Sequence, residues 1–375
     1  MVLVMAATDR EIVIVVGTRP EIIKMAPIIK QLERRGIDFL FIHTGQHYDY
    51  EMSLRFIEEL QLPNPDESFR LKANTPTVQI GEMMIRLEEV LDKQRKKPRI
   101  MLVQGDTNSM LAAGLTAVKL SIKLGHVEAG LRSYDWRMPE EHNRRMIDHI
   151  SDYLFAPTEI AKKNLLEEHV WGEVFLTGNT VIDAVEMYIK KVLDIEKTVL
   201  ERIRFDEYGL VTFHRAENVD NPEVLRSFVK VLQKSRIPLV YPIHPRTKRR
   251  MEEFGLINEV EKINHLQLLP PQGYFEMLAL MRNAKVILTD SGGLQEEATH
   301  PRIRKPVLVL RTSTERPEAV IHGFSRVVGV NPVIVLTELE RTLTNPPTLP
   351  DYSPFGDGRA AEGIVDVISK KLSEY

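Results

Sequence analysis

Apolar runs of strand length alternate with amphipathic segments along the whole chain. In the first half, the runs that predict strands are 12–16, 39–42, 100–103, 122–127, 153–155 and 174–176. Segments with helical spacing of apolar residues lie between them, near 21–34, 51–60, 77–93, 108–120, 140–150, 158–168 and 180–193. This alternation predicts βαβ units and a parallel, doubly wound sheet. Pro27 falls inside the first helical pattern, so we expect a kink there or a later helix start.

A charged stretch, 195–206, is interpreted as the separator of two halves, because the alternation resumes after it. Strands are then predicted at 210–213, 239–243, 265–268, 286–288, 307–310 and 326–328. The Pro-rich segment 345–354 is interpreted as a linker before a last helix. The fold class is therefore α/β, with Rossmann-like domains at 1–183 and 184–357 and the helix 358–375 packing back on the first. The ligand is expected in the cleft between them, at the carboxyl ends of the strands.

Composition narrows the class of protein. The length of 375 residues suits two domains of about 150 residues each. The chain has no cysteine, which excludes disulfides, thiolate catalysis and Cys-ligated zinc. The net charge of −3, with both signs interspersed, gives no surface for nucleic acid or membrane. No apolar run approaches the ~18 residues of a membrane helix, and the apolar start is too short for a signal peptide, so a soluble, cytoplasmic protein is expected.

The stretch 286–298 combines a buried strand, a small-residue turn and the start of a helix. Gly292 and Gly293 let a ligand approach the backbone, and N–H groups at a helix start can bind a phosphate. Glu296 or Glu297, a turn further on, could accept hydrogen bonds from a ribose diol. The structural alternative is a tight turn whose acids complement the helix dipole.

The loop after the first strand does not match a nicotinamide-binding enzyme. Such an enzyme would carry G-x-G-x-x-G there, but Gly17 is the one glycine and Arg19 and Pro20 follow it. Arg19 is suited to a bidentate phosphate contact, with Pro20 opening the helix. The alternative is a turn arginine paired with a neighbouring carboxylate.

Three carboxylates could act as acids or bases: Asp106, Glu128 and Glu140. Asp106 could instead cap the helix that follows it, and Glu140 has the position of an ordinary helix-start acid. Glu128 precedes Ala-Gly and has no structural explanation in the sequence. His126 and His142 lie near these acids, but H-E-x-x-H is absent and no metal is expected.

His214 ends the first strand of the second half. A protonated histidine there can bind a diphosphate or return a proton to a leaving group, and the alternative is a histidine that satisfies backbone groups. Polar residues follow other predicted strands as well, among them Thr18, Arg19, Gln46, His47, Asp106, Glu128, His244, Ser291 and Arg311. Core packing explains apolar strands but not charged residues at their ends, so this placement indicates a functional edge.

Together these residues resemble the non-hydrolysing UDP-N-acetylglucosamine 2-epimerases of bacteria and archaea. The resemblance runs over nearly all of the chain. It rests on ordered blocks: GTRPEIIKMAP (17–27), TGQH (44–47), QGDTNS (104–109), GHVEAGLRS (125–133), MPEEHNRR (138–145), FAPT (155–158), TGNTVIDA (177–184), HRAENVDN (214–221), IHPRT (243–247), LTDSGGLQEEA (288–298) and TERPEAV (314–320).

The resemblance implies a glycosyltransferase-B-like homodimer with a UDP-sugar substrate, no organic cofactor and a role in polysaccharide biosynthesis. It assigns the nucleotide and its diphosphate to Arg19, Lys24, His214, Ser291, Gly292 and Gly293, and the ribose to Glu297. It assigns the sugar or the closed cleft to Gln295, Glu296 and Arg316. It makes Asp106, Glu128 and Glu140 the catalytic carboxylates, with His214 among the catalytic residues.

The implied reaction agrees with what the sequence lacks. C2 of N-acetylglucosamine is not next to a carbonyl, and no nicotinamide motif is present to oxidise a neighbouring carbon. The remaining route eliminates UDP to give 2-acetamidoglucal and re-adds it after protonation of the other face. That route needs carboxylates at C2 and cations that hold the diphosphate. A hydrolysing 2-epimerase, a glycosyltransferase of this fold and a non-catalytic UDP-sugar sensor are the alternatives.

Bacterial members of the family are activated by a second UDP-N-acetylglucosamine. The resemblance places that pocket at Gln46, His47 and Arg215, which are all present. The loop 70–77 lacks the Pro-Gly-Gln pattern expected there, and Ala216 stands where the family often has a second arginine. A pocket without part of its polar lining leaves ligand groups unpaired, so a weakened or remodelled activator site is expected.

Overall fold

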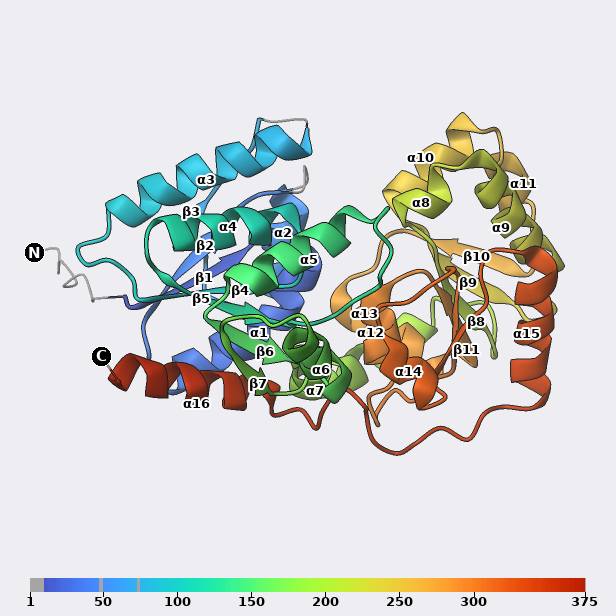
Figure 1. Cartoon of the computed structure of the whole chain (residues 1–375). Helices are drawn as coiled ribbons and strands as arrows, with labels where there is room; N and C mark the ends of the chain where they lie inside the picture. Colours follow the sequence, from blue (N-terminus) through green and yellow to red (C-terminus); the bar gives the residue numbers. More distant parts are fainter. Residues whose placement is uncertain (1–9, 47–49, 73–74, 375) are drawn as a thin grey trace, which may run out of the picture. The chain divides into compact units, whose positions relative to one another are not determined.

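The chain forms two compact units in this computed structural model, which describes residues 10–46, 50–72 and 75–374 (Figure 1). Unit 1 comprises Met1–Ala184 and Gly356–Tyr375, and unit 2 comprises Val185–Phe355. The strands of unit 1 are β1 (Ile12–Val16), β2 (Phe39–His43), β3 (Glu67–Ser68), β4 (Ile100–Gln104), β5 (Lys123–Val127), β6 (Tyr153–Ala156) and β7 (Glu173–Leu176). Its helices are α1 (Arg19–Arg34), α2 (Tyr50–Glu59), α3 (Pro76–Asp92), α4 (Asn108–Lys119), α5 (Pro139–Ile150), α6 (Glu159–Glu167) and α16 (Ala360–Ser373).

Helix α7 (Thr180–Leu200) passes from unit 1 into unit 2. The strands of unit 2 are β8 (Gly209–Thr212), β9 (Leu239–Pro242), β10 (Leu266–Leu269), β11 (Val286–Thr289), β12 (Val307–Val309) and β13 (Ser325–Val327). Its helices are α8 (Ala216–Val219), α9 (Pro222–Lys234), α10 (Pro245–Glu253), α11 (Ile257–Glu261), α12 (Tyr274–Asn283), α13 (Gly292–Glu297), α14 (Pro317–Ile321) and α15 (Pro332–Thr344).

Each unit is built on one parallel sheet. The strand order is β3-β2-β1-β4-β5-β6-β7 in unit 1 and β10-β9-β8-β11-β12-β13 in unit 2. In both sheets the order reverses beside the first strand of the unit, at β1/β4 and at β8/β11, as in a Rossmann fold. The predicted α/β class with two Rossmann-like, doubly wound units is confirmed. Ligands of such sheets bind outside the carboxyl ends of the strands at the reversal point.

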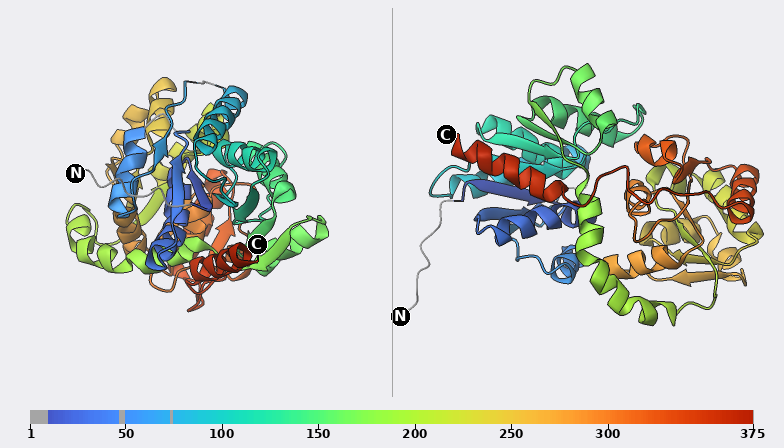
Figure 2. Two further views of the ribbon diagram at one scale, coloured as in Figure 1. Left: turned by 90° about the vertical axis from the view of Figure 1, so that its left-hand side faces the viewer. Right: turned by 90° about the horizontal axis from the view of Figure 1, so that it is seen from below.

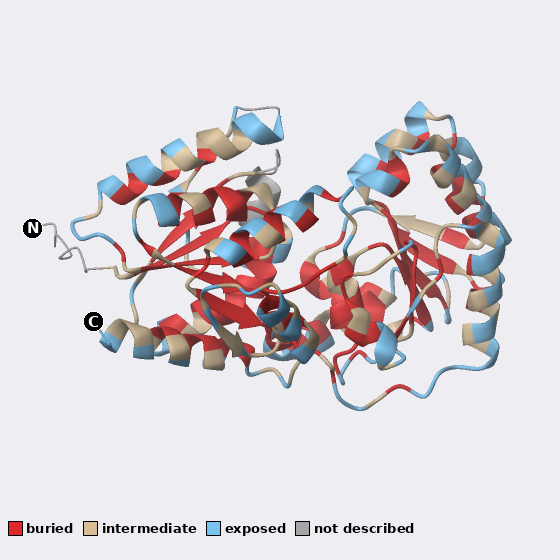
Figure 3. Ribbon diagram, in the orientation of Figure 1, coloured by how far each residue is buried: buried red, intermediate tan, exposed pale blue. Residues whose placement is uncertain are grey.

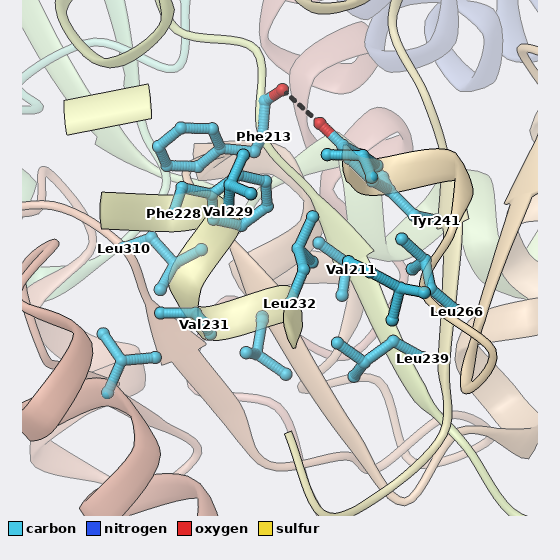
Figure 4. Packing of buried hydrophobic residues seen from close by; sticks show 14 of the residues in the cluster. Val211, Phe213, Phe228, Val229, Val231, Leu232, Leu239, Tyr241, Leu266 and Leu310 are labelled. Carbon is cyan, nitrogen blue, oxygen red and sulfur yellow. Dashed lines mark hydrogen bonds between the residues drawn. The ribbon is translucent and has the colours of Figure 1, made fainter. Parts of the chain in front are cut away.

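The strands are buried because helices cover both faces of each sheet. All five residues of β1 are inaccessible to solvent, which suits its continuous apolar sequence Ile-Val-Ile-Val-Val. Figure 3 shows the central strands of both sheets as buried and the outward faces of the helices as exposed, whereas the edge strands β7 and β10 are partly exposed. The core of unit 2 includes Phe213 and Phe228, whose rings stack at a centroid distance of 4.0 Å (Figure 4). The Tyr241 hydroxyl donates to the Phe213 carbonyl at 3.0 Å, which anchors the end of β8.

The last helix belongs to the first unit. α16 packs against α1, and Figure 2 shows it in red beside the elements of unit 1. Arg35 pairs with Asp366 at 2.6 Å, and the Asp183 carboxylate accepts from the Ala360 and Ala361 N–H groups at 3.2 and 2.8 Å. The segment 345–354 that leads to α16 is irregular and contains the buried residues Leu349 and Ser353.

Two details of the predicted elements are wrong. α1 begins at Arg19 and runs through Pro27, so the helix does not start late. The charged stretch 195–206 does not separate the halves, because the boundary between the units follows Ala184 and the whole stretch lies in unit 2. Val199 is buried there, and Glu196 accepts from Arg282 at 2.9 Å, so this part of the stretch has both a packed and a charged face.

Candidate active site

Glu21 joins the ends of β1 and β4, the strands at which the sheet of unit 1 reverses its order. Its carboxylate accepts hydrogen bonds from the backbone N–H groups of Gly17 and Thr18 and from the Thr107 hydroxyl. Burial raises the pKa of Glu21 to about 7, although these hydrogen bonds act in the opposite direction. The loop that follows β1 is thus fastened to the loop that follows β4.

Asp106 lies in the loop after β4, where Arg144 of α5 holds it. The Arg144 guanidinium donates to Oδ2 of Asp106 from Nη2 at 2.6 Å and from Nε at 3.1 Å. The Asn143 amide donates to the Asp106 carbonyl at 2.9 Å. Thr107 is the residue that caps α4, because its hydroxyl accepts from the Met110 N–H. The alternative interpretation of Asp106 as a helix cap is therefore wrong.

Glu128 follows β5 in a left-handed backbone conformation, with φ at +69°, which non-glycine residues seldom adopt. Its N–H and that of Ala129 both donate to the Phe155 carbonyl at 3.1 Å. The carboxylate is buried, and its Oε2 accepts from the Lys24 ammonium and, at 2.7 Å, from the Gln104 amide. Such a conformation persists only where the surroundings hold it, and it is frequent at functional sites.

Lys24, which the resemblance assigns to the nucleotide, forms this ion pair from the second turn of α1. The Lys24 side chain is 6% exposed and that of Glu128 is 4% exposed. A buried ammonium requires an anionic partner, so the lysine and the carboxylate act as one pair. The resemblance assigns Lys24 to the nucleotide and Glu128 to catalysis, whereas the structure shows the two groups in contact.

Glu140 lies half-buried in the first turn of α5, beside a carboxylate with a different use. Glu141 is fully buried and accepts from the N–H and the hydroxyl of Ser133, both at 2.9 Å, and from Arg144 at 3.0 Å. Burial raises the pKa of Glu141, but the Ser133 and Arg144 contacts outweigh it and the pKa lies below its ordinary value. Of the two neighbours, Glu141 therefore holds the loop and Glu140 is the candidate for chemistry.

Arg19 and Gln46 lie at the same edge of the unit 1 sheet, after β1 and β2. The Arg19 guanidinium lies 4.3 Å from the centroid of the Phe56 ring, a cation–π contact that orients it. The Gln46 side-chain oxygen accepts from the Ser109 N–H at 2.8 Å and from its hydroxyl at 2.7 Å, at the start of α4. His47 lies outside the described residues.

Asp290 links the ends of two strands in unit 2, as Glu21 does in unit 1. It is fully buried between the ends of β8 and β11. Its carboxylate accepts from the N–H groups of His214 and Arg215 at 2.9 and 2.8 Å, and from the Asn218 amide at 3.1 Å. The His214 Nδ1 also lies 3.2 Å from Asp290. The backbone of His214, the residue predicted to bind the diphosphate, is thus fixed by the buried Asp290 carboxylate.

The His214 ring is more exposed than its backbone, with 36% of the side chain accessible. The Phe213 carbonyl before it accepts from the Thr247 hydroxyl at 2.6 Å, in addition to Tyr241. The His244 ring lies 5.5 Å from the His214 ring, between centroids. His244 also caps α10, because its Nδ1 accepts from the Arg246 N–H at 3.1 Å.

The turn from Ser291 to Gly293 begins the short helix α13, as the sequence predicted. The Ser291 N–H donates to the Thr289 hydroxyl at 2.9 Å. A Cβ at Gly292 would come within 2.8 Å of a Glu315 carboxylate oxygen, whereas nothing lies within 4 Å of one at Gly293. A side chain at Gly292 would therefore displace the Glu315 carboxylate, whereas the space beside Gly293 is open.

Three polar side chains of α13 point into unit 2 and are buried. Glu296 pairs with Arg316, and the Gln295 amide oxygen accepts from the Thr314 hydroxyl at 2.8 Å. Glu297 is 6% exposed. The structure thus brings Gln295, Glu296 and Arg316 together in unit 2.

Glu315 joins Arg215 to the same group. Its Oε1 accepts from Arg215 at 3.2 Å, and its Oε2 accepts from Arg311 at 2.6 Å. Arg215, which the resemblance assigns to an activator pocket, is therefore linked through Glu315 to the loop of Arg316.

Residues 10–46, 50–72 and 75–374 contain neither a candidate metal site nor a helix that could cross a membrane. No group of three or more His, Asp or Glu side chains there could hold a metal ion. None of the helices in this part of the chain is long and apolar enough to cross a membrane.

Comparisons with known proteins identify the family of this chain. The profile of the UDP-N-acetylglucosamine 2-epimerase family matches residues 30–369. A UDP-N-acetylglucosamine 2-epimerase of Methanocaldococcus jannaschii is 45% identical, over 95% of this chain and 98% of its own. A UDP-2,3-diacetamido-2,3-dideoxy-D-glucuronate 2-epimerase of Pseudomonas aeruginosa is 36% identical, over 96% and 99%.

Solved structures give the same result. The crystal structure of the M. jannaschii UDP-GlcNAc 2-epimerase in complex with UDP-GlcNAc and UDP is similar to this chain, with a TM-score of 0.88. That similarity covers 96% of this chain and 99% of the other, at 44% identity. The chain belongs to the UDP-N-acetylglucosamine 2-epimerase family.

Proposed function

We propose that this protein is an isomerase that interconverts UDP-N-acetylglucosamine and UDP-N-acetylmannosamine by inversion at C2. The observation that carries the proposal is the set of three carboxylates, Asp106, Glu128 and Glu140, on the segments that follow β4 and β5 in a member of this family. The relative that acts on N-acetylglucosamine is the more similar one, at 45% against 36% identity for the diacetamido-glucuronate enzyme.

The chemistry requires a base and an acid at C2. A carboxylate removes the C2 proton, the C1–C2 double bond forms, and the C1–O bond breaks with its electron pair leaving on UDP. A carboxylic acid then protonates C2 of 2-acetamidoglucal from the other face, and UDP re-adds at C1. Positioned carboxylates of this kind contribute about 10²–10⁴-fold each to such steps.

The surroundings of two of these carboxylates suit that work. Asp106 receives two donors from Arg144, and Glu128 receives Lys24 and Gln104. Both are thus held in one orientation before substrate binds, as proton transfer at a fixed carbon requires.

The groups of unit 2 suit the nucleotide. His214 and Ser291, with Gly292 and Gly293 beside them, would hold the diphosphate. In unit 1, Arg19 is the residue that the resemblance assigns to the same group. Cationic groups on the diphosphate stabilise the charge that develops when the C1–O bond breaks. Glu297 would accept the ribose hydroxyls. His214 keeps its backbone fixed on Asp290 while its ring remains accessible, which is what a ligand to a departing group needs.

The further expectations from the resemblance are a cytoplasmic homodimer that supplies polysaccharide biosynthesis, and an activator pocket at Gln46 and Arg215. For Gln46, the hydrogen bonds to Ser109 support a fixed orientation of its side chain.

One experiment tests the proposed reaction. UDP-N-acetylglucosamine is incubated with the pure protein and the mixture is followed by proton NMR. The proposal predicts a stable mixture of UDP-N-acetylglucosamine and UDP-N-acetylmannosamine. Free N-acetylmannosamine with UDP would show a hydrolysing 2-epimerase instead, and an unchanged spectrum would refute both.

A further inference from the structure

His126 takes no part in the reaction derived above, although it lies next to two of the candidate carboxylates. It is buried on β5, with 1% of its side chain exposed. Its Nε2 lies 2.9 Å from the Gly105 carbonyl, and its Nδ1 lies 2.7 Å from a carboxylate oxygen of Asp148. A carbonyl can only accept, so Nε2 donates to Gly105, while Nδ1 faces the carboxylate of Asp148.

Asp148 is the anion that this ring contacts. It is fully buried, and its second oxygen accepts from Arg132 at 2.7 Å and from the Gly130 N–H at 3.2 Å. Burial raises the pKa of Asp148, but the contacts with His126 and Arg132 outweigh it and the pKa lies below its ordinary value. Asp148 therefore contacts the side chain two residues before Glu128 and the backbone two residues after it.

The charges continue from Arg132 back to Asp106. Arg132 donates to Glu168 from Nε at 2.9 Å, and Arg145 pairs with the same Glu168 at 2.8 Å. Arg145 donates to Glu141 at 3.2 Å, and Glu141 accepts from Arg144 at 3.0 Å. Arg144 holds Asp106, as described above. Positive and negative groups alternate at every step.

The chain of contacts closes on itself, because Asp106 is the neighbour of Gly105, whose carbonyl accepts from His126. Asp106 is the most exposed anion of this closed circuit, with 28% of its side chain accessible, against 18% for Glu168. The circuit also contacts both flanks of Glu128 and contains Glu141, the neighbour of Glu140. Asp106 is thus a member of the circuit, Glu140 is the sequence neighbour of its member Glu141, and Glu128 lies two residues after its member His126.

Stability alone does not account for such an arrangement. A buried ion pair contributes little net stability, because the desolvation of both groups offsets their attraction. Its value lies in holding one geometry, since a misplacement of about 1 Å in an active site costs ~10²-fold in rate.

We infer that His126 is a positioning residue for catalysis: its ring closes a circuit of polar and charged groups that holds Asp106 and the Glu128 loop in register. The inference rests on the proposed function, because its effect is measured on C2 chemistry. His126 itself contacts the Gly105 carbonyl and Asp148, and it acts through the carboxylates.

The test replaces His126 with Gln, which can donate from its nitrogen to one acceptor but not to both. The turnover number kcat for UDP-N-acetylglucosamine should fall about 10- to 100-fold, while the Kd for UDP changes less than about twofold. Thr116→Val is the matched control: it removes a buried hydrogen bond in the same unit, from the Thr116 hydroxyl to the Ala112 carbonyl at 2.8 Å, outside the circuit. Its kcat should stay at the wild-type value.

A double variant separates positioning from general destabilisation. In an Asp106→Asn background, adding His126→Gln should change kcat by less than about threefold, because residues that act through one another are not additive. Arg144→Lys, which keeps the charge but not the two-armed contact, should lower kcat by a similar factor. That variant carries the test if the His126 variant does not fold.

The outcomes are distinct. A wild type that epimerises, together with a folded His126→Gln variant at wild-type kcat, overturns the inference, and so does Thr116→Val losing as much activity. Fully additive losses with Asp106→Asn also overturn it. A wild type that does not epimerise UDP-N-acetylglucosamine refutes the proposed function instead.

Discussion

Replacing Glu21 with Gln should stabilise unit 1 at neutral and alkaline pH but not at acidic pH. Glu21 is 1% exposed, and its pKa is about 7 in the folded protein against an ordinary value of 4.5. Between these values the folded chain holds a proton that the unfolded chain has released. The wild type must therefore lose stability as the pH rises through this window. The interval of 2.5 pKa units corresponds to about 3 kcal/mol.

Glutamine keeps the shape of the site without the titration. Its carbonyl oxygen can accept from the Gly17 and Thr18 N–H groups, and its amide can donate to the Thr107 hydroxyl. The two proteins should thus have equal stability near pH 4.5. At pH 8 the free energy of unfolding of the variant should exceed that of the wild type by about 2–3 kcal/mol.

Urea unfolding at several pH values from 4.5 to 8 measures this difference. Both tryptophans of the chain, Trp136 and Trp171, lie in unit 1, so their emission follows that unit. Glu33→Gln is the control: it removes an exposed carboxylate of the same helix, paired with Lys30 at 2.8 Å, and such pairs contribute only ~0–1 kcal/mol. If the wild type gains stability over Glu21→Gln as the pH rises, the three hydrogen bonds outweigh burial and the reasoning is refuted.

Three other predictions follow from the site. Glu297→Ala should weaken UDP binding by ~1.5–3 kcal/mol in calorimetry, while Glu128→Gln leaves it nearly intact; the reverse pattern would mean that a ligand and a catalytic acid have been exchanged. Arg316→Met should lower the free energy of unfolding of unit 2 by ~3–5 kcal/mol, because it removes the cation beside buried Glu296. Adding Glu296→Gln should restore part of that loss, and no recovery would contradict a buried ion pair. Starting from UDP-N-acetylmannosamine alone, the reaction should proceed without added UDP-N-acetylglucosamine, whereas a lag abolished by a trace of that compound would show an intact activator site.

The strands were predictable because parallel strands buried on both faces are written as continuous apolar runs. β1 was found at the predicted residues, and the other predicted strands lie within a residue or two of their expected ends. β3 was missed, because Glu67 and Ser68 contain no apolar residue and pair with β2 by backbone alone. The length of α7 was underestimated, because its last turns are rich in charge and bury only single residues such as Val199.

The sequence allows candidate site residues to be selected, but it does not predict which of them contact one another. Polar residues directly after apolar strands indicate the carboxyl edge of a sheet, so Asp106, His214 and Ser291 could be selected. The contact between Lys24 and Glu128 spans 104 positions, and no local pattern predicts such a contact. The sequence also does not indicate Glu21 and Asp290 as site residues. A buried carboxylate that accepts backbone N–H groups looks in sequence like an ordinary capping acid.

The Arg144 contact to Asp106 was hidden for the same reason. Arg144 lies in a helix with several charged neighbours, and only the fold selects which of them reaches the loop after β4. An arginine in such a helix is most simply explained as part of a solvated surface, whereas here its side chain is 4% exposed.

The exchange of hydrogen at C2 shows directly whether the protein removes the C2 proton. UDP-N-acetylglucosamine is incubated with the enzyme in D₂O, and the recovered UDP-sugars are examined by mass spectrometry and proton NMR. If a carboxylate removes the C2 proton, UDP-N-acetylmannosamine should carry deuterium at C2. Asp106→Asn, Glu128→Gln or Glu140→Gln should slow its formation by ~10²-fold or more. UDP-N-acetylmannosamine that retains the original hydrogen at C2 would contradict the account, because inversion would then occur without removal of that proton.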